Sequence, residues 1–338
     1  MPMYDFDDLF GNDPRTVSRG LELHELAVVF SGLDTLYLVA EYPHSDIFDQ
    51  WIIYAPDLSD PHLYRGIPVR DFLVGRGSLG YKLRVQQGDV RLFLTDHGDD
   101  NLRDQGKHGM VFMLQIGPMW LRQHGDEGAD KLVAAIYEQL RAFGVQEPEN
   151  YPLRLNRIDA TMDVVGLPIK EFSADFWQRS WVGRARSKSF HVDPKTGCFS
   201  GLTVGTSDGA VRFKAYDKIL RSIQTRSLQF WYSVWNISPE MLDDVDELFV
   251  TRFEWTFFSH RGKFTGMQYL SEFTDDGVRG LLNYATLRWG RLCRPNGGKN
   301  TSRWPTHPFW EQLRGWLAEA WNLDSAGTAK RNYHMTPD

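Results

Sequence analysis

Three short stretches of the sequence carry polar residues at every second position. These stretches are Arg157-x-Asp159-x-Thr161-x-Asp163, Arg212-x-Lys214-x-Tyr216-x-Lys218 and Arg252-x-Glu254-x-Thr256. The residues between them are mostly apolar, and successive side chains of a β-strand point to opposite faces of its sheet. The spacing therefore predicts three strands with one apolar face and one face that carries three carboxylates, a tyrosine and several cations. This combination suits metal-assisted transesterification of a nucleic-acid backbone by a tyrosine.

The three carboxylates are candidate metal ligands. Asp159 and Asp163 lie four residues apart on one predicted strand face, and Glu254 lies on another strand. Crowded carboxylates repel each other, so they require a metal ion, an arginine or water. Salt bridges to Arg157 and Arg252 are the structural alternative. Mg²⁺ and Mn²⁺ prefer oxygen ligands, and the sequence holds no competing cluster of cysteine or histidine, so we expect one of these ions at the three carboxylates.

Tyr216 is the candidate nucleophile. A free phenol has a pKa of about 10, so a tyrosine that attacks at neutral pH needs a base or nearby positive charge. Lys214 and Lys218 flank Tyr216 on its own face and provide that charge. The structural alternative is a half-buried sheet tyrosine that makes one hydrogen bond.

Composition indicates a globular protein. The chain has 338 residues, of which 42% are hydrophobic and 14% aromatic, which predicts one large domain or two smaller ones. No run of 18 apolar residues occurs, and the first residues are acidic, so we expect no transmembrane helix and no secretory signal. Cys198 and Cys293 are the only cysteines, which predicts no disulfide framework and agrees with a cytoplasmic location.

Positive charge is concentrated in two segments. The formal net charge of the chain is -6, which is not typical of a general nucleic-acid binder. Residues 184–226 nevertheless hold nine Lys/Arg against three Asp, and residues 279–314 hold seven Lys/Arg against one Glu. Each segment is therefore about +6, a focused field that could attract phosphates. A solvated basic surface is the alternative.

The pattern of apolar residues predicts an α+β fold. We expect a large, mostly antiparallel β-sheet built from two related halves, with helices packed on one face and a helical C-terminal region. Strands at 21–30 and 35–42 are expected to flank a turn at Ser31-Gly32, and residues 187–201 are expected to form a loop. The predicted divisions are a flexible arm 1–19, an N-terminal half 20–150, a catalytic half 151–264, a helical region 265–325 and a tail 326–338.

Two further patterns bear on the class of protein. Residues 75–80 fit G-x-G-x-x-G, but a predicted strand rather than a helix follows them, so the sequence does not support dinucleotide binding. No GxxxxGK[ST] motif is present, so the chain is not expected to be an ATPase or a helicase. Trp289 and Trp304 lie among arginines and could stack on the bases of an opened DNA strand.

The ordered motifs resemble those of the replication initiation factor (Rep_trans) family, the rolling-circle initiators of plasmids and phages, together with related relaxases of conjugative elements. Residues 155–164 are similar to the R-x-D-x-x-x-D strand of that family. Residues 205–218 resemble its segment that ends in Y-[DN]-K, and residues 251–254 resemble its R-[FIV]-E strand. The resemblance covers roughly residues 20–315, and the specific feature is the order of the three short motifs.

The resemblance implies a nickase that starts replication at an origin. In such an enzyme a tyrosine, here Tyr216, attacks one DNA strand, which leaves a 5′-phosphotyrosine and a free 3′-hydroxyl. It implies metal or acid–base roles for the three carboxylates and a catalytic phosphate contact for Lys218. The residues expected to contact DNA are Arg157, Arg212, Lys214 and Arg252. Lys214 departs from the family pattern, which usually has arginine there.

The expected partner is origin DNA, as a single strand or a melted duplex. A host helicase and a second copy of the chain are expected partners by resemblance only. Two alternatives to the tyrosine nickase stay open at this point. One is a non-catalytic origin-binding protein, and the other is a metal-dependent phosphodiesterase that uses water as its nucleophile.

Overall fold

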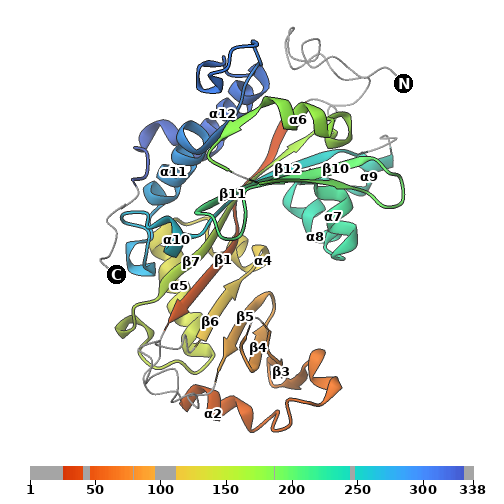
Figure 1. The fold of residues 1–338 in the computed structure, drawn as a ribbon. Helices are drawn as coiled ribbons and strands as arrows, with labels where there is room; N and C mark the ends of the chain where they lie inside the picture. The colour runs from red at the N-terminus through yellow and green to blue at the C-terminus, as the bar shows by residue number, and fades with distance from the viewer. Residues whose placement is uncertain are drawn as a thin grey trace. The chain divides into compact units, whose positions relative to one another are not determined.

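The computed structural model describes residues 26–40, 46–78, 80–95, 112–185, 187–243 and 248–330 (Figure 1). The chain folds into two compact units. Unit 1 contains the described residues within 1–32, 160–257 and 278–330, and unit 2 contains those within 33–159 and 258–277. The predicted arm 1–19 lies outside the described residues, as do the last eight residues of the predicted tail.

The described residues form an 11-stranded sheet with the strand order β2-β3-β4-β5-β6-β1-β7-β12-β11-β10-β9, and a two-stranded sheet β13-β8. The two longest strands, β1 (Ala27–Ala40) and β7 (Arg154–Val165), contribute residues to both units. The strand pairs β1–β6, β2–β3, β3–β4, β4–β5, β5–β6, β9–β10, β10–β11, β11–β12 and β8–β13 are antiparallel. An α+β fold around a large, mostly antiparallel sheet is therefore confirmed.

Unit 2 holds one end of the large sheet. Its strands are β2 (Ile67–Val69), β3 (Phe72–Arg76), β4 (Leu83–Gln87), β5 (Val90–Leu94) and β6 (Phe112–Ile116). Strand alternation places one fully buried apolar row across β3, β4, β5, β6 and β1, made of Val74, Val85, Leu92, Leu114 and Leu38. The α-helices described in this unit are α2 (Asp46–Ile52), α4 (Pro118–His124), α5 (Ala129–Ala142) and α10 (Ser259–Gly262).

Unit 1 contains the strands β9 (Lys188–Val192), β10 (Phe199–Val204), β11 (Val211–Asp217) and β12 (Val250–Phe257). Phe213, Phe253 and Trp255 line one buried face of β11 and β12. The rings of Phe213 and Phe253 contact aromatic side chains from α6 (Ala174–Ser180) and α12 (Pro308–Trp321). These contacts form the aromatic core of unit 1.

Helices α7 (Lys218–Gln224) and α8 (Leu228–Val234) lie on the other side of the same strands (Figure 1). Trp235, which ends α8, hydrogen-bonds to Asp163 of β7. Helices of unit 1 therefore contact both faces of its strands, whereas the sequence predicts them on one. The reason is that α7 begins directly after β11 ends and lies on the polar face of these strands.

Helix boundaries follow local capping chemistry. Ser173 accepts a hydrogen bond from the Phe176 amide and begins α6, as its residue type predicts. Pro308 occupies the first turn of α12, where its missing N–H costs nothing, and Asn322 ends that helix in the left-handed region with φ 51°. The structure also describes α9 (Pro239–Asp243), α11 (Asp275–Tyr284) and a π-helical turn at Ala285–Trp289.

Three predicted elements differ from the structure. Strand β1 runs without a break through Ser31 and Gly32, where a turn is predicted. Residues 187–201 contain β9 and the start of β10 in place of a loop. The first part of the predicted helical region 265–325 holds only a 3₁₀ turn at Leu270–Glu272 before the helix Asp275–Tyr284. In each case pairing or packing with distant residues outweighs the local pattern.

Candidate active site

The polar face of β11 and β12 confirms the predicted alternation. The register pairs Arg212 with Thr256, Lys214 with Glu254, and Tyr216 with Arg252. The residues between these positions are buried in the aromatic core on the opposite face. Two neighbouring strands therefore bring the predicted nucleophile, one predicted metal ligand and several predicted DNA contacts onto one face.

Tyr216, Glu254 and Lys214 form a hydrogen-bonded group on this face. The Tyr216 hydroxyl donates to Glu254 Oε2 at 3.1 Å, and Lys214 Nζ donates to Glu254 Oε1 at 2.5 Å. Glu254 is only 3% exposed, whereas Tyr216 and Lys214 are half-buried. A carboxylate within hydrogen-bond reach of a phenol can accept its proton, and the ammonium group balances the charge of the carboxylate.

Gly201 of β10 lets Tyr216 take this position. The two residues face each other in the β10–β11 pair. A β-carbon at Gly201 would lie 2.7 Å from Tyr216 Cβ and 2.7 Å from the Ala215 carbonyl oxygen. Real β-carbon contacts are not this short, so a side chain at 201 would displace β11 or β10. A glycine inside a strand is the sequence signal for such a close approach.

Asp163 and Arg252 form a buried ion pair beside this group. Arg252 donates from Nε to Asp163 Oδ1 at 2.6 Å and from Nη2 to Oδ2 at 2.7 Å. Trp235 Nε1 donates to the same Oδ2 at 2.8 Å, and both charged residues are 0% exposed. With both carboxylate oxygens in use and no exposure, Asp163 does not fit the predicted role of a metal ligand. Arg252 likewise does not fit the predicted role of a DNA contact.

The indole ring of Trp231 lies against two cations. Lys218 Nζ is 3.8 Å and Arg252 Cζ is 4.0 Å from the ring centroid, distances typical of cation–π contacts. Phe30 packs edge-on to the same ring. Lys218 is 6% exposed, so this environment does not fit its predicted contact with a phosphate.

Arg157 and Asp159 pair with each other in unit 2. Arg157 Nε donates to Asp159 Oδ1 at 2.9 Å, and its Nη2 makes a second bond to Oδ2. The guanidinium also lies 5.1 Å from the ring centroid of Tyr37. Asp159 is buried and Arg157 is partly exposed. This geometry matches the structural alternative considered for the two residues, a salt bridge along one strand.

The three predicted metal ligands are each engaged by a different cation: Arg157 for Asp159, Arg252 for Asp163 and Lys214 for Glu254. Among the residues that the structure describes, no three His, Cys, Asp or Glu side chains form a group that could hold a metal ion. As a set, the three carboxylates therefore do not fit a metal site. The dependence on Mg²⁺ or Mn²⁺ stays a prediction.

Two tryptophans of the α8 region have parts in the site that the sequence did not predict. Trp231 and Trp235 support Arg252 and Asp163, residues that are distant in sequence. The local signal was only an aromatic cluster. The prediction that Trp289 stacks on bases does not fit, because that ring is buried edge-on to Trp181. Trp304 is half-buried and its indole N–H is bound to the Gly298 carbonyl.

The fold of the chain is similar to that of a solved structure. This structure is a rolling circle replication initiator protein from Geobacillus stearothermophilus, with 14% sequence identity and a TM-score of 0.48. The match covers 89% of this chain and 99% of that chain. Neither a protein-family model nor a curated protein matches the chain. A likeness at this level carries no argument about the chemistry of the site.

The described helices are short or polar relative to the thickness of a lipid bilayer. In the part of the chain that the structure describes, none of them is both long and apolar enough to cross a membrane.

Proposed function

We propose that this chain is a replication initiator that cuts and rejoins one DNA strand, with Tyr216 as the nucleophile and Glu254 as the general base. The observation that supports the proposal most is the 3.1 Å hydrogen bond from the Tyr216 hydroxyl to Glu254 Oε2. It places a proton acceptor at the atom that has to lose a proton. The ordered motifs around Asp159, Tyr216 and Glu254 add the resemblance to replication initiators.

The proposed reaction is a transesterification at phosphorus. The Tyr216 oxygen forms a bond to the phosphorus while Glu254 accepts the phenolic proton. The bond to the 3′-oxygen breaks, that oxygen takes up a proton from water, and Glu254 then releases the phenolic proton to water, so the step is balanced in protons. The products are a 5′-phosphotyrosine and a free 3′-hydroxyl. Because the phosphotyrosine retains the energy of the ester bond, the reverse attack rejoins the strand without a nucleotide.

Cations on the same face would position the phosphate. Lys214 is bound to Glu254, and Arg212 lies two residues away on the same side of β11. Both are half-buried, so part of each side chain is accessible. Charge developing on the phosphate oxygens during attack is stabilised by such donors. We expect Arg212 to make the direct phosphate contact and Lys214 to turn from Glu254 toward the phosphate once Glu254 is protonated.

The buried pair of Asp163 and Arg252 would hold the site rigid. Arg252 is the register partner of Tyr216, and its side chain is held by two bonds to Asp163. A fixed Arg252 keeps β12, and so Glu254 two residues further along, in place against β11. Reacting groups that are held in position before substrate binds lower the barrier to reaction. We therefore assign Asp163 and Arg252 as positioning residues.

The test is covalent capture of DNA. Labelled single-stranded oligonucleotides tiled across the DNA that surrounds the gene are incubated with the protein, with either Mg²⁺ or Mn²⁺ or with a chelator, and resolved under denaturing conditions. We expect a protein–DNA adduct with the wild type and none with Tyr216→Phe. The control is Tyr232→Phe, which alters a half-buried tyrosine of α8 and should form as much adduct as the wild type.

The other outcomes identify the alternatives. Cleavage by Tyr216→Phe without any adduct would indicate a phosphodiesterase that uses water. Binding without cleavage by any variant, in every metal condition, would indicate a non-catalytic DNA-binding protein. The chelator lane tests the predicted metal dependence separately. If adduct formation requires a metal ion, its ligands must differ from the three carboxylates in their present ion pairs.

A further inference from the structure

The two basic segments of the sequence meet at the small two-stranded sheet of unit 1. Strand β8 (Trp181–Gly183) leads into the first basic segment, and β13 (Gly290–Leu292) lies inside the second. The strands pair Gly183 with Gly290, and the Arg184 amide donates to the Trp289 carbonyl at 2.8 Å. Charges that lie about a hundred residues apart in the chain are thereby brought to one place.

This small sheet is held firmly on the aromatic core. A β-carbon at Gly290 would lie 2.3 Å from the Trp181 ring, and one at Gly183 would lie 2.7 Å from the Trp289 carbonyl oxygen. Only glycine allows so close an approach. Trp181 itself packs against Phe213 of β11 and Trp310 of α12. The sheet is thus a fixed platform.

Hydrogen bonds within residues 291–305 hold the loop after β13 in one conformation. Arg291 Nη2 donates to the carbonyls of Ser302 at 2.9 Å and Trp304 at 3.1 Å. Trp304 Nε1 donates to the Gly298 carbonyl at 2.9 Å, and the Arg294 amide donates to the Pro305 carbonyl at 2.9 Å. An exposed loop with this many internal bonds presents its outward side chains from fixed backbone positions.

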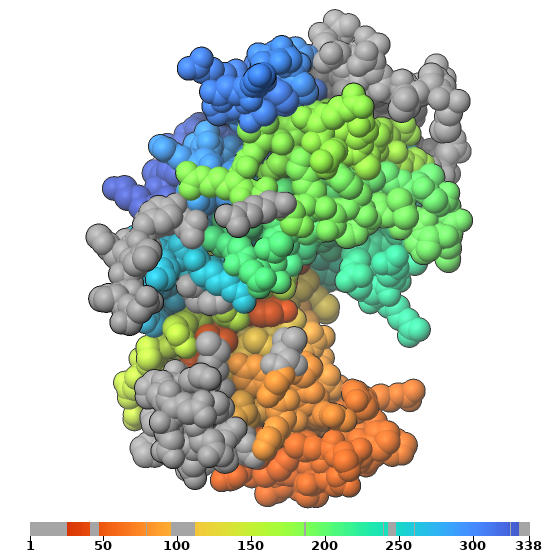
Figure 2. Space-filling model, viewed as in Figure 1, coloured from red at the N-terminus to blue at the C-terminus, as the bar shows by residue number. Residues whose placement is uncertain are grey.

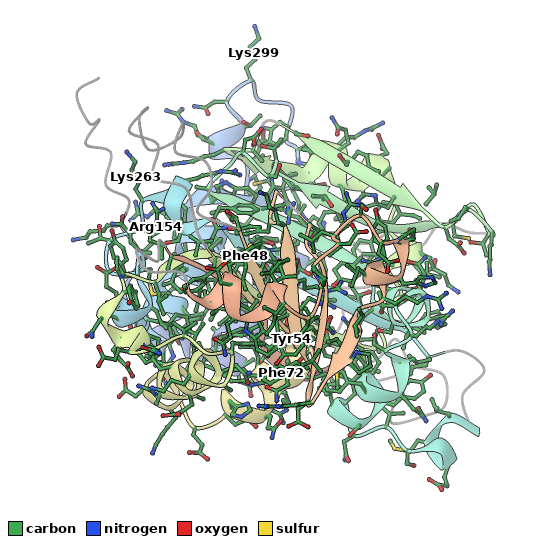
Figure 3. The ribbon with its side chains drawn as sticks, turned by 90° about the horizontal axis from the view of Figure 1, so that it is seen from below. Phe48, Tyr54, Phe72, Arg154, Lys263 and Lys299 are labelled. Atoms are coloured by element: carbon green, nitrogen blue, oxygen red, sulfur yellow. The ribbon has the colours of Figure 1, made fainter. Side chains whose placement is uncertain are left out.

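The charged side chains exposed on this loop are all cations. Residues 277–310 contain no Asp or Glu. We define the basic surface as the exposed residues of the platform and its loop: Arg184, Arg288, Arg294, Lys299 and Arg303. Lys299 projects from the edge of the molecule in Figure 3, and Figure 2 shows the blue atoms near residue 300 beside the yellow-green atoms near residue 180.

The platform also adjoins the strand that carries Tyr216. A β-carbon at Gly205 would lie 3.3 Å from the Trp289 ring and 3.4 Å from Arg212 Cα. Trp289, the residue before β13, therefore packs at the end of β11 where Arg212 lies. A polyanion bound on the basic surface would be anchored to the same rigid body as the Tyr216 site.

We propose that the basic surface binds the phosphate backbone of duplex DNA, next to the strand that Tyr216 cuts. That Tyr216 cuts this strand rests on the proposed function. Exposed positive charge, most of it in residues 277–310, which contain no Asp or Glu, suits phosphates. Duplex is favoured over single-stranded DNA because single-strand binding relies on accessible aromatic rings for stacking. Here Trp289 is buried and the indole of Trp304 is bound within its own loop.

The test compares two triple variants that remove the same charge. The variant R294Q/K299Q/R303Q alters the basic surface, and the control R65Q/K131Q/K263Q removes three exposed cations from unit 2. Fluorescence anisotropy measures binding of a labelled random-sequence duplex, and of one of its single strands, over a series of salt concentrations. Circular dichroism confirms that both variants are folded.

The basic-surface variant is expected to bind the duplex about tenfold or more weakly at moderate salt, and to lower the slope of log K against log salt by about 2 to 3. The control is expected to bind as the wild type does. Equal duplex binding by the wild type and R294Q/K299Q/R303Q would overturn the inference, as would a loss confined to the single strand.

The same variant keeps this inference separate from the proposed function. Adduct formation on a short single-stranded oligonucleotide depends on Tyr216 and not on the basic surface, so R294Q/K299Q/R303Q is expected to form the adduct as the wild type does. If no protein forms an adduct but the duplex binding defect is present, the basic surface stands and the proposed chemistry fails. If adducts form and R294Q/K299Q/R303Q binds the duplex as the wild type does, the proposed chemistry is supported and the basic surface is not.

Discussion

Tyr216 and Glu254 are diagonal neighbours on adjacent antiparallel strands. Tyr216 lies opposite Arg252 in the register, and Glu254 lies opposite Lys214, yet the Tyr216 hydroxyl reaches Glu254 Oε2 at 3.1 Å. Diagonal pairs of long side chains are within reach of each other on one face of a sheet. The geometry leaves Lys214 and Tyr216 on the two sides of a single carboxylate, which is the arrangement expected of a base shared between an acid and a counter-ion.

Replacing the carboxylate tests its role as a base. Glu254→Gln keeps the size of the side chain but removes its ability to accept a proton from Tyr216. We expect single-turnover adduct formation to slow by about 10² to 10⁴, the usual contribution of a general base. DNA binding should change little. An adduct rate within a few fold of the wild type would show that another group takes the proton.

Gly201 tests the positioning of the nucleophile. Gly201→Ala places a β-carbon 2.7 Å from Tyr216 Cβ, so β10 or β11 must shift. Overpacking of this kind costs about 1 to 3 kcal/mol of unfolding free energy, and the shift of Tyr216 should slow adduct formation. Gly209→Ala is the matched control, because its β-carbon would meet nothing closer than 3.4 Å.

Denaturant melts and adduct assays of the two alanine variants give the comparison. If Gly201→Ala and Gly209→Ala behave alike in both assays, Gly201 does not position Tyr216.

Removal of the buried carboxylate tests the structural assignment of Asp163. Asp163→Asn leaves the Arg252 guanidinium buried without its counter-ion, which should cost about 3 to 5 kcal/mol of unfolding free energy. Asp175→Asn, at the exposed Arg179–Asp175 pair, is the control and should have a small effect. Urea denaturation measures both. A near-neutral Asp163→Asn would mean that the pair is not intact in solution.

Tyr81 provides a pH test of the packing of unit 2. Burial raises the pKa of Tyr81 from 10.0 to about 12. Below pH 10 the phenol is protonated in both the folded and unfolded states, so stability does not depend on it. Between these two pKa values the unfolded chain loses the proton first, so stability should fall as pH rises.

Tyr81→Phe should remove that part of the alkaline loss of stability. Denaturation midpoints of the wild type and variant, measured below and above pH 10, give the difference. Equal pH dependence in the two proteins would contradict the assigned burial of Tyr81.

Local patterns predicted much of the fold because they reflect local physics. Alternation of polar and apolar residues located β7, β11 and β12, and Ser173 has a residue type typical of the N-cap position that it occupies in α6. The hairpin of β9 and β10 was missed because residues 187–201 are rich in polar residues and glycine, and only pairing makes them strands. The same reason applies to the uninterrupted β1.

The site was predicted in part. Sequence spacing placed Tyr216, Lys214 and Glu254 on one face, and the structure does so too. Sequence spacing could not show which charges pair. Pairing depends on the order of the strands in the sheet and on the helices that pack against them. Thus Asp163 is bound to Arg252 and Trp235, and Lys218 lies against Trp231, where the sequence suggested a metal and a phosphate.

The most direct measurement is the identity of the residue that becomes joined to DNA. The wild-type protein is incubated with a cleavable single-stranded oligonucleotide, digested with a protease and a nuclease, and the peptide that carries nucleotide is sequenced by tandem mass spectrometry. We expect a phosphodiester-linked nucleotide on Tyr216. A nucleotide on a peptide that lacks residue 216, or cleaved DNA with no modified peptide, would contradict it.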